Sequence, residues 1–62
     1  RAYSRDHPSV AITLYNLAMG HGRLGDNAKK RELLERTLAI FQSAYGTDHN
    51  HTKLCQRKLA EL

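Results

Sequence analysis

The stretch AYSRDHP at residues 2–8 returns in altered form as AYGTDHN at residues 44–50. The two copies are 44 − 2 = 42 residues apart, and the same offset places Leu17 on Leu59. The repetition therefore includes the hydrophobic skeleton as well as the polar residues. A period between about 20 and 50 residues is typical of proteins that stack copies of one supersecondary unit. The sequence predicts one complete unit and the beginning of another.

The first unit opens with a helix that we predict at about residues 8–23. Its apolar or small residues follow steps of three and four, which is the spacing of one helical face. These residues are Val10, Ala11, Leu14, Leu17, Ala18 and His21. Pro8 suits the first turn, because proline lacks only an N–H that would be unpaired there. Gly25 suits the exit from the helix.

A second helix is predicted at about residues 27–45, with Asp26 as its N-cap and Gly46 as the residue that ends it. Two neighbouring stripes of mostly apolar residues run along it, so we expect this helix to contact two neighbours. The stripes are Leu34, Leu38, Phe41 and Tyr45, and Leu33, Thr37, Ile40 and Ala44.

A third helix is predicted at about residues 50–62, with its apolar residues on one side only. These are Leu54, Cys55, Leu59 and Leu62. Short loops make consecutive helices antiparallel neighbours, so the predicted fold class is all-α, an antiparallel helix–turn–helix hairpin with a C-terminal capping helix. The expected core consists of Leu14, Leu17, Ala18, Leu34, Leu38, Phe41 and Leu59.

The chain resembles the 42-residue tetratricopeptide repeats of the kinesin light chain type, whose consensus sequence is close to DHPxVAxTLxNLAxxYxxxGxxxxAxxLxxRALxIxxxxxGxDHP. The matching positions are Asp6, His7, Pro8, Val10, Ala11, Thr13, Leu14, Asn16, Leu17, Ala18, Gly25, Leu33, Arg36, Leu38, Ile40, Gly46, Asp48 and His49. The departures are His21 for an aromatic residue, Lys30 for a buried small residue, Thr37 for alanine and Asn50 for the second proline.

The resemblance implies a fragment of an α-solenoid with three parts. Residues 1–5 are expected to be the end of a preceding helix, residues 6–47 one complete repeat, and residues 48–62 the first helix of the next unit, which serves as a cap. About three repeats are normally needed for independent stability. We therefore interpret the chain as a piece of a longer protein.

Composition and charge narrow the expected partners and setting. Ten Lys and Arg against six Asp and Glu give a net charge of +4, which favours an acidic partner or a phosphate backbone. The basic residues lack the interleaved aromatic residues of single-strand binding surfaces. Cys55 is the only cysteine, so an internal disulfide is impossible and a reduced cytoplasmic setting is expected. No run of about 18 apolar residues predicts a membrane span.

Neither a metal site nor an active site is predicted. His51 and Cys55 lie four residues apart, and with His49 they are candidate zinc ligands, but a fourth ligand is missing. His7 and His49 recur with the repeat, which indicates a structural role. Catalysis needs a nucleophile, a base and a group that orients the base. The sequence shows no such set, so we predict no catalytic residues and no cofactor.

The resemblance also implies a binding surface, because in this family the first helix of each repeat lines a concave groove that binds peptides. The Asn of the NLA motif, here Asn16, often bonds the peptide backbone. Helical spacing and the 42-residue offset extend the groove. The predicted groove residues are Ile12, Tyr15, Asn16, Met19, Arg23, Arg57 and Lys58. Packing against a neighbouring helix is the alternative role for Tyr15 and Met19.

The leading hypothesis is a non-catalytic interaction scaffold that binds a peptide or protein partner, preferably an acidic one, in this groove. A second hypothesis is a purely structural repeat module whose exposed ends associate with copies of itself. A third, less favoured, is a basic helical hairpin that binds nucleic acid. No small-molecule substrate and no membrane partner are expected.

Overall fold

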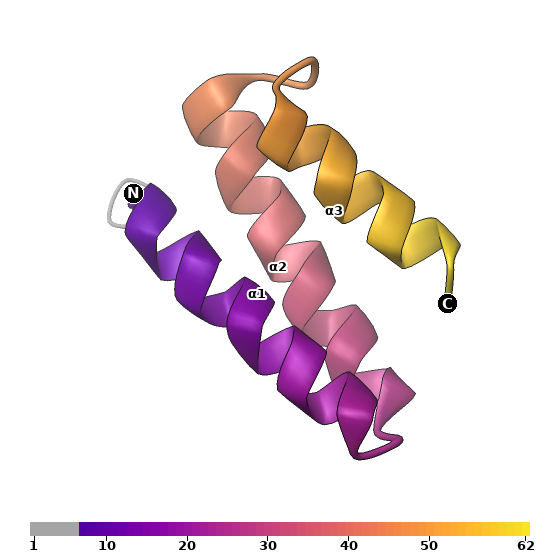
Figure 1. The fold of residues 1–62 in the computed structure, drawn as a ribbon. Helices are drawn as coiled ribbons and strands as arrows, with labels where there is room; N and C mark the ends of the chain where they lie inside the picture. The colour runs from indigo at the N-terminus through magenta and orange to yellow at the C-terminus, as the bar shows by residue number, and fades with distance from the viewer. Residues whose placement is uncertain (1–6) are drawn as a thin grey trace.

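The computed structural model describes residues 7–62, which form three helices and the turns between them. α1 spans Pro8–Arg23, α2 spans Asn27–Tyr45 and α3 spans Asn50–Ala60. α2 lies between α1 and α3 and runs antiparallel to both, as Figure 1 shows. The all-α prediction is confirmed, and the helix bounds agree with the predicted ones to within two residues. The expected helix end at residues 1–5 lies outside the described residues.

α1 and α3 begin with the same capping interaction, one repeat apart. The Nδ1 atom of His7 accepts a hydrogen bond from the backbone N–H of Ser9 at 3.2 Å, and that of His49 accepts one from His51 at 3.1 Å. Each bond satisfies an N–H group that has no partner within its helix. The prediction that these recurring histidines are structural is confirmed.

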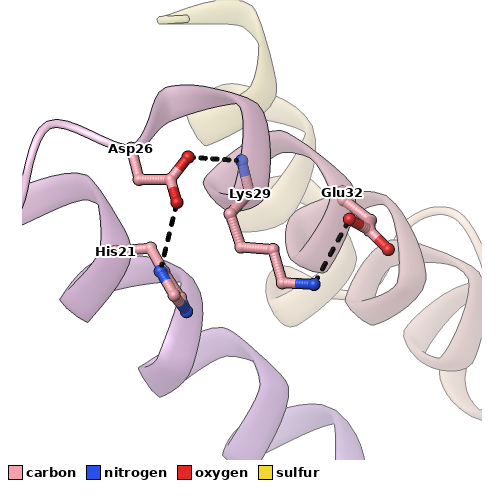
Figure 2. Close-up of polar contacts among 4 residues, drawn as sticks. All are labelled: His21, Asp26, Lys29 and Glu32. Carbon is pink, nitrogen blue, oxygen red and sulfur yellow. Dashed lines mark hydrogen bonds and ion pairs between the residues drawn. The ribbon is translucent and has the colours of Figure 1, made fainter.

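Asp26 stabilises the turn between α1 and α2 through contacts with both helices. The turn passes through Gly25 at φ +84°, in the left-handed region where glycine has no steric penalty. The Asp26 N–H then donates to the carbonyl of His21 at 2.9 Å, and one carboxylate oxygen accepts from the Lys29 N–H at 3.2 Å. The other carboxylate oxygen lies 3.7 Å from the His21 Nδ1 atom (Figure 2). His21, where an aromatic residue is usual, therefore partners the N-cap of α2.

The core lies on both sides of α2. α1 approaches α2 along Ala11 and Ala18, which are fully buried and whose small side chains allow a close approach. One cluster contains Ala11, Ile40, Phe41 and Cys55, and a second contains Ala18, Leu33 and Leu34. Both predicted stripes of α2 contribute buried residues, which confirms that this helix contacts two neighbours.

The hydroxyl groups of two buried threonines donate hydrogen bonds to backbone carbonyls. Thr37 donates to the carbonyl of Leu33 and Thr52 donates to the carbonyl of Gly46, both at 2.8 Å. A buried hydroxyl without a partner would cost about 1–3 kcal/mol. Thr37 can therefore occupy a position where alanine is usual, and Thr52 ties the first turn of α3 to the α2–α3 turn.

The expected core was wrong at Leu17, whose side chain is 49% exposed. The contact line of α1 runs through Ala11 and Ala18, and one residue turns a helix by about 100°. Leu17 therefore lies to one side of that line. Ala18, Leu34 and Phe41 are buried as predicted, and the partly buried core residues are Leu14, Leu38 and Leu59.

The predicted apolar side of α3 was also partly wrong, because Leu54 and Leu62 are more than a third exposed. The side that meets α2 carries Thr52 and Cys55, both fully buried, and Leu59, which is partly buried. These three residues follow steps of three and four, whereas Leu54 lies about 100° from Cys55 around the helix.

The lysine at a usually small position is accommodated by a glycine opposite. A Cβ atom added to Gly22 would lie 2.8 Å from the Cδ atom of Lys30. The aliphatic stem of Lys30 therefore lies directly over Gly22, and long charged side chains commonly cover other residues in this way while their charged ends remain in water. Lys30 thus does not force the two helices apart at this point.

Leu34→Ala should lower the free energy of unfolding by about 2–5 kcal/mol, because Leu34 is fully buried and its truncation leaves a cavity. Leu24→Ala is the matched control, since Leu24 is 82% exposed and its loss should change stability by less than about 0.5 kcal/mol. Urea denaturation measures both. Equal effects of the two substitutions would contradict the described packing of α1 on α2.

Gly20→Ala and Gly25→Ala should have opposite effects on stability. A Cβ atom at Gly20, inside α1, would meet nothing within 4 Å, so alanine should stabilise the helix by about 0.5–1 kcal/mol. Gly25 has a positive φ of 84°, where a side chain costs about 1–2 kcal/mol. Thermal unfolding followed by circular dichroism distinguishes the two signs. A stabilising Gly25→Ala would show that Gly25 does not adopt the left-handed conformation.

Candidate protein-binding groove

A pocket of about 280 Å³ lies where α1 and α3 face each other across α2. We call it the α1–α3 pocket. Ile12 and Tyr15 line it from α1, Phe41 from α2, and His51 and Leu54 from α3. All three helices of residues 7–62 therefore contribute to one site.

Equivalent turns of two equivalent helices form the walls of this pocket. Ile12 and Leu54 are 54 − 12 = 42 residues apart, so they occupy the same place in the repeat. Tyr15 lies three residues after Ile12, and His51 lies three residues before Leu54, which places each pair on one helical face. Phe41, only 4% exposed, belongs to the core and closes the pocket from the α2 side.

The pocket is mainly a carbon surface that remains open to solvent. Ile12 is 49% exposed and Leu54 is 38% exposed. The side-chain polar groups at the pocket are the hydroxyl of Tyr15 and the imidazole of His51. A concave apolar surface with a few polar groups is the usual character of a binding site. Its burial by a partner is favourable by about 25 cal/mol per Å².

A stack of rings fixes the edge of the pocket where α2 meets α3. The rings of Phe41 and His51 stack at a centroid distance of 5.2 Å, and those of Tyr45 and His49 stack at 4.3 Å. The two imidazoles lie 5.0 Å apart. Stacked rings contribute favourable energy beyond their buried area. The orientation of His51 toward the pocket is therefore determined by α2 as well as by the cap of α3.

Of the predicted groove residues, the pocket brings together Ile12 and Tyr15. Asn16 lines a second depression, of about 270 Å³, which α1 and its C-cap form alone. The other residues of that depression are Leu17, Gly20, His21 and Leu24. Met19 packs against the cluster that contains Ala18, and Tyr15 packs against both core clusters. Arg23 is exposed in the last turn of α1.

The two predicted basic residues of α3 lie in its last turn. Lys58 follows His51 and Leu54 at helical spacing, so it lies on their side of α3. Its Nζ atom is 3.8 Å from a carboxylate oxygen of Glu61. Arg57 is exposed and lies further around the helix from His51. Lys58 is therefore the cation of α3 that is closest in register to the pocket.

Phe41 and His51 are pocket residues that the sequence reasoning missed. Phe41 was assigned only to the core, and His51 was considered only as a metal ligand. The spacing of three residues between His51 and Leu54 was the available signal for His51. For Phe41 no local signal exists, because its place in the pocket results from the packing of α3 on α2.

The candidate zinc ligands His49, His51 and Cys55 do not form a metal centre. Cys55 is fully buried, and burial raises the pKa of its thiol, which favours the neutral form over the thiolate that binds metals. The Nδ1 atom of His49 is engaged in the cap of α3. Within residues 7–62, no group of three His, Cys, Asp or Glu side chains could hold a metal ion.

Comparison with known proteins bears on the repeat directly. The family model of the tetratricopeptide repeat matches residues 9–62. Neither a curated protein nor a solved structure matches the chain. None of the helices in the described part of the chain is sufficiently long and apolar to cross a membrane.

His49→Ala should lower stability by about 0.5–2 kcal/mol, because α3 loses its N-cap acceptor and Tyr45 loses its stacked ring. His49→Asn should retain most of the cap, because asparagine is among the preferred N-cap residues. Amide hydrogen exchange in residues 51–55, read by NMR, should accelerate more in His49→Ala than in His49→Asn. Unchanged exchange in both variants would show that this cap does not hold α3.

Proposed function

Because the chain belongs to the tetratricopeptide repeat family, which generally mediates protein–protein interactions, we propose that it is a non-catalytic scaffold element that binds a peptide or protein partner in the groove between α1 and α3. The observation that carries this proposal is the α1–α3 pocket, an apolar depression that all three helices line. Protein binding follows from the family, and the position of the groove is our inference.

The pocket suits one anchoring side chain of a partner. Its volume of about 280 Å³ falls below the range of roughly 300–1,000 Å³ that is common for small-molecule sites. A peptide would therefore place one aliphatic or aromatic side chain between Ile12 and Leu54, over Phe41. The rest of the peptide would follow the surface of α1 toward Asn16, where its backbone could bond the exposed amide.

The positive charge of the chain as a whole, together with Lys58 on the pocket side of α3, favours an acidic partner. The chain carries a net charge of +4, and Arg23 and Arg57 are exposed. Lys58 lies on the pocket side of α3, where Glu61 offsets part of its charge. Opposite charges near a surface accelerate association and select partners, and they are screened by salt. An acidic segment beside the anchoring residue would complement this surface.

The boundaries of the repeat unit belong to the same proposal, with residues 6–47 as one complete repeat of an α-solenoid and residues 48–62 as its cap. The side of α1 that meets α2 carries Ala11, Leu14 and Ala18. The 42-residue offset carries these positions to Lys53, Gln56 and Ala60, which are all exposed. α3 thus has one side for α2 and a mostly polar side for solvent, which suits a terminal helix.

The kinesin light chain subtype and the cytoplasmic setting remain predictions from the sequence. A single buried cysteine is compatible with a reducing compartment. Nucleic acid is the less favoured partner, because the α1–α3 pocket is apolar and its rings are engaged with one another.

Selection from a displayed library of random peptides of about 12 residues, a length that spans several anchor positions, tests the groove. Selected peptides should share one large apolar residue near acidic residues. Leu54→Lys should weaken their binding roughly tenfold, as expected for loss of an interface anchor worth more than about 1 kcal/mol. Asn16→Ala should weaken it about fivefold, the scale of one hydrogen bond. Isothermal calorimetry measures both.

Leu24→Lys is the matched control, since it adds the same charge at an 82% exposed leucine outside the pocket. Equal losses in Leu54→Lys and Leu24→Lys would contradict the proposed groove, and an unchanged Asn16→Ala would assign Asn16 to structure alone. A salt titration with duplex DNA tests the alternative partner. Affinity for DNA that exceeds peptide affinity and falls with a logarithmic slope of about 0.9 per phosphate contacted would favour nucleic acid.

A further inference from the structure

α1 has an exposed side, partly apolar, that lies outside both core clusters of the described residues. It carries Val10, Thr13 and Leu17, and we call it the Val10 side. Val10 is 41% exposed and Leu17 is 49% exposed. The depression of about 270 Å³ beside Leu17 extends this side to Leu24, which is 82% exposed. Contiguous exposed apolar surface of this kind commonly marks an interaction site.

The repeat indicates which kind of surface the Val10 side can pack on. The 42-residue offset carries Val10, Thr13 and Leu17 to Thr52, Cys55 and Leu59. Those three residues are the side of α3 that packs on α2, with Thr52 and Cys55 fully buried and Leu59 against the cluster of Leu33 and Leu34. The Val10 side of α1 therefore repeats the side of α3 that holds α2.

We propose that the Val10 side of α1 binds α2 of a second copy of this chain, in the place of that copy's own α3. α1 and α3 are equivalent helices with the same histidine cap. They would present equivalent residues to the same surface of α2. The two sides are similar in apolar character, since Val10 stands where α3 has Thr52 and Thr13 stands where α3 has Cys55.

The attachment of α3 to α2 permits this exchange. α3 is an 11-residue helix, and only one of its sides is apolar. Thr52 donates to the Gly46 carbonyl, a bond that a valine at the equivalent position cannot make. The bonds of His51 and Lys53 to His49 cap α3 and are local to its own first turn. α3 can move away on the short turn at residues 46–49 without disturbing the contact between α1 and α2.

The geometry of the contact also determines the type of assembly. α1 of one copy meets α2 of the next, so the two surfaces differ and the contact is heterologous. Each added copy leaves one Val10 side free at one end and one α3 in place at the other. The assembly is therefore head-to-tail and grows by the addition of single copies. Every exchanged α3 exposes Cys55, which is fully buried when α3 is in place.

Sedimentation equilibrium over about a hundredfold range of concentration, with Cys55 reactivity measured in parallel, tests the exchange. The mass should rise above 7.1 kDa with concentration, and Cys55 should react faster with a disulfide reagent over the same range. Leu17→Lys should keep the mass at the monomer value. Leu59→Lys should shift association to lower concentration, because it weakens the hold of α3 on α2.

Leu54→Lys is the matched control, since Leu54 lies outside the Val10 side and outside the buried side of α3. It should associate like the unmodified chain, although it should bind peptides roughly tenfold more weakly. Circular dichroism checks the folding of each variant, and Leu59→Ala replaces Leu59→Lys if the latter unfolds. A constant monomer mass would overturn the exchange. Association with Cys55 still protected, or association unaffected by Leu17→Lys, would overturn it as well.

Discussion

The packing of α2 on two sides at once is the constraint from which the other features of this structure follow. A chain of 62 residues hides only about 60% of the surface that its unfolded form exposes, so its core is thin. Leu34 clusters with Ala18 of α1, and Ile40 clusters with Cys55 of α3. Neither α1 nor α3 alone covers both stripes of α2. Both outer helices are therefore needed, and the pocket between them is a consequence of this arrangement.

Much of the fold could be predicted from the sequence because local signals agree with the tertiary structure. Asp26 and Gly46 mark the bounds of α2 by cap chemistry that depends on a few neighbouring residues. The histidine caps could be inferred from their recurrence, since His7 and His49 occupy the same position of the repeat. Such features are encoded within one or two helical turns, and the structure confirms them at the level of individual hydrogen bonds.

What could not be predicted depends on the rotation of each helix about its axis. Apolar spacing placed Leu14, Leu17 and Ala18 in one stripe, but such a stripe is wider than the contact between two helices. The small residues Ala11 and Ala18 allow the closest approach, so they set the contact line and leave Leu17 at its edge. The same rotation separates Asn16 from Tyr15, although the two residues are adjacent in the sequence and were assigned to one groove.

The two proposed interactions both depend on where α3 lies. The α1–α3 pocket takes His51 and Leu54 from α3, so a peptide anchored there contacts α3 only while it is docked on α2. Exchange of α3 for the α1 of another copy removes these two residues from the pocket. A ligand that binds one of two states stabilises that state by mass action. In this scheme, peptide binding would favour the docked α3 and oppose assembly, and assembly would in turn weaken peptide binding, because linkage between two binding equilibria is reciprocal.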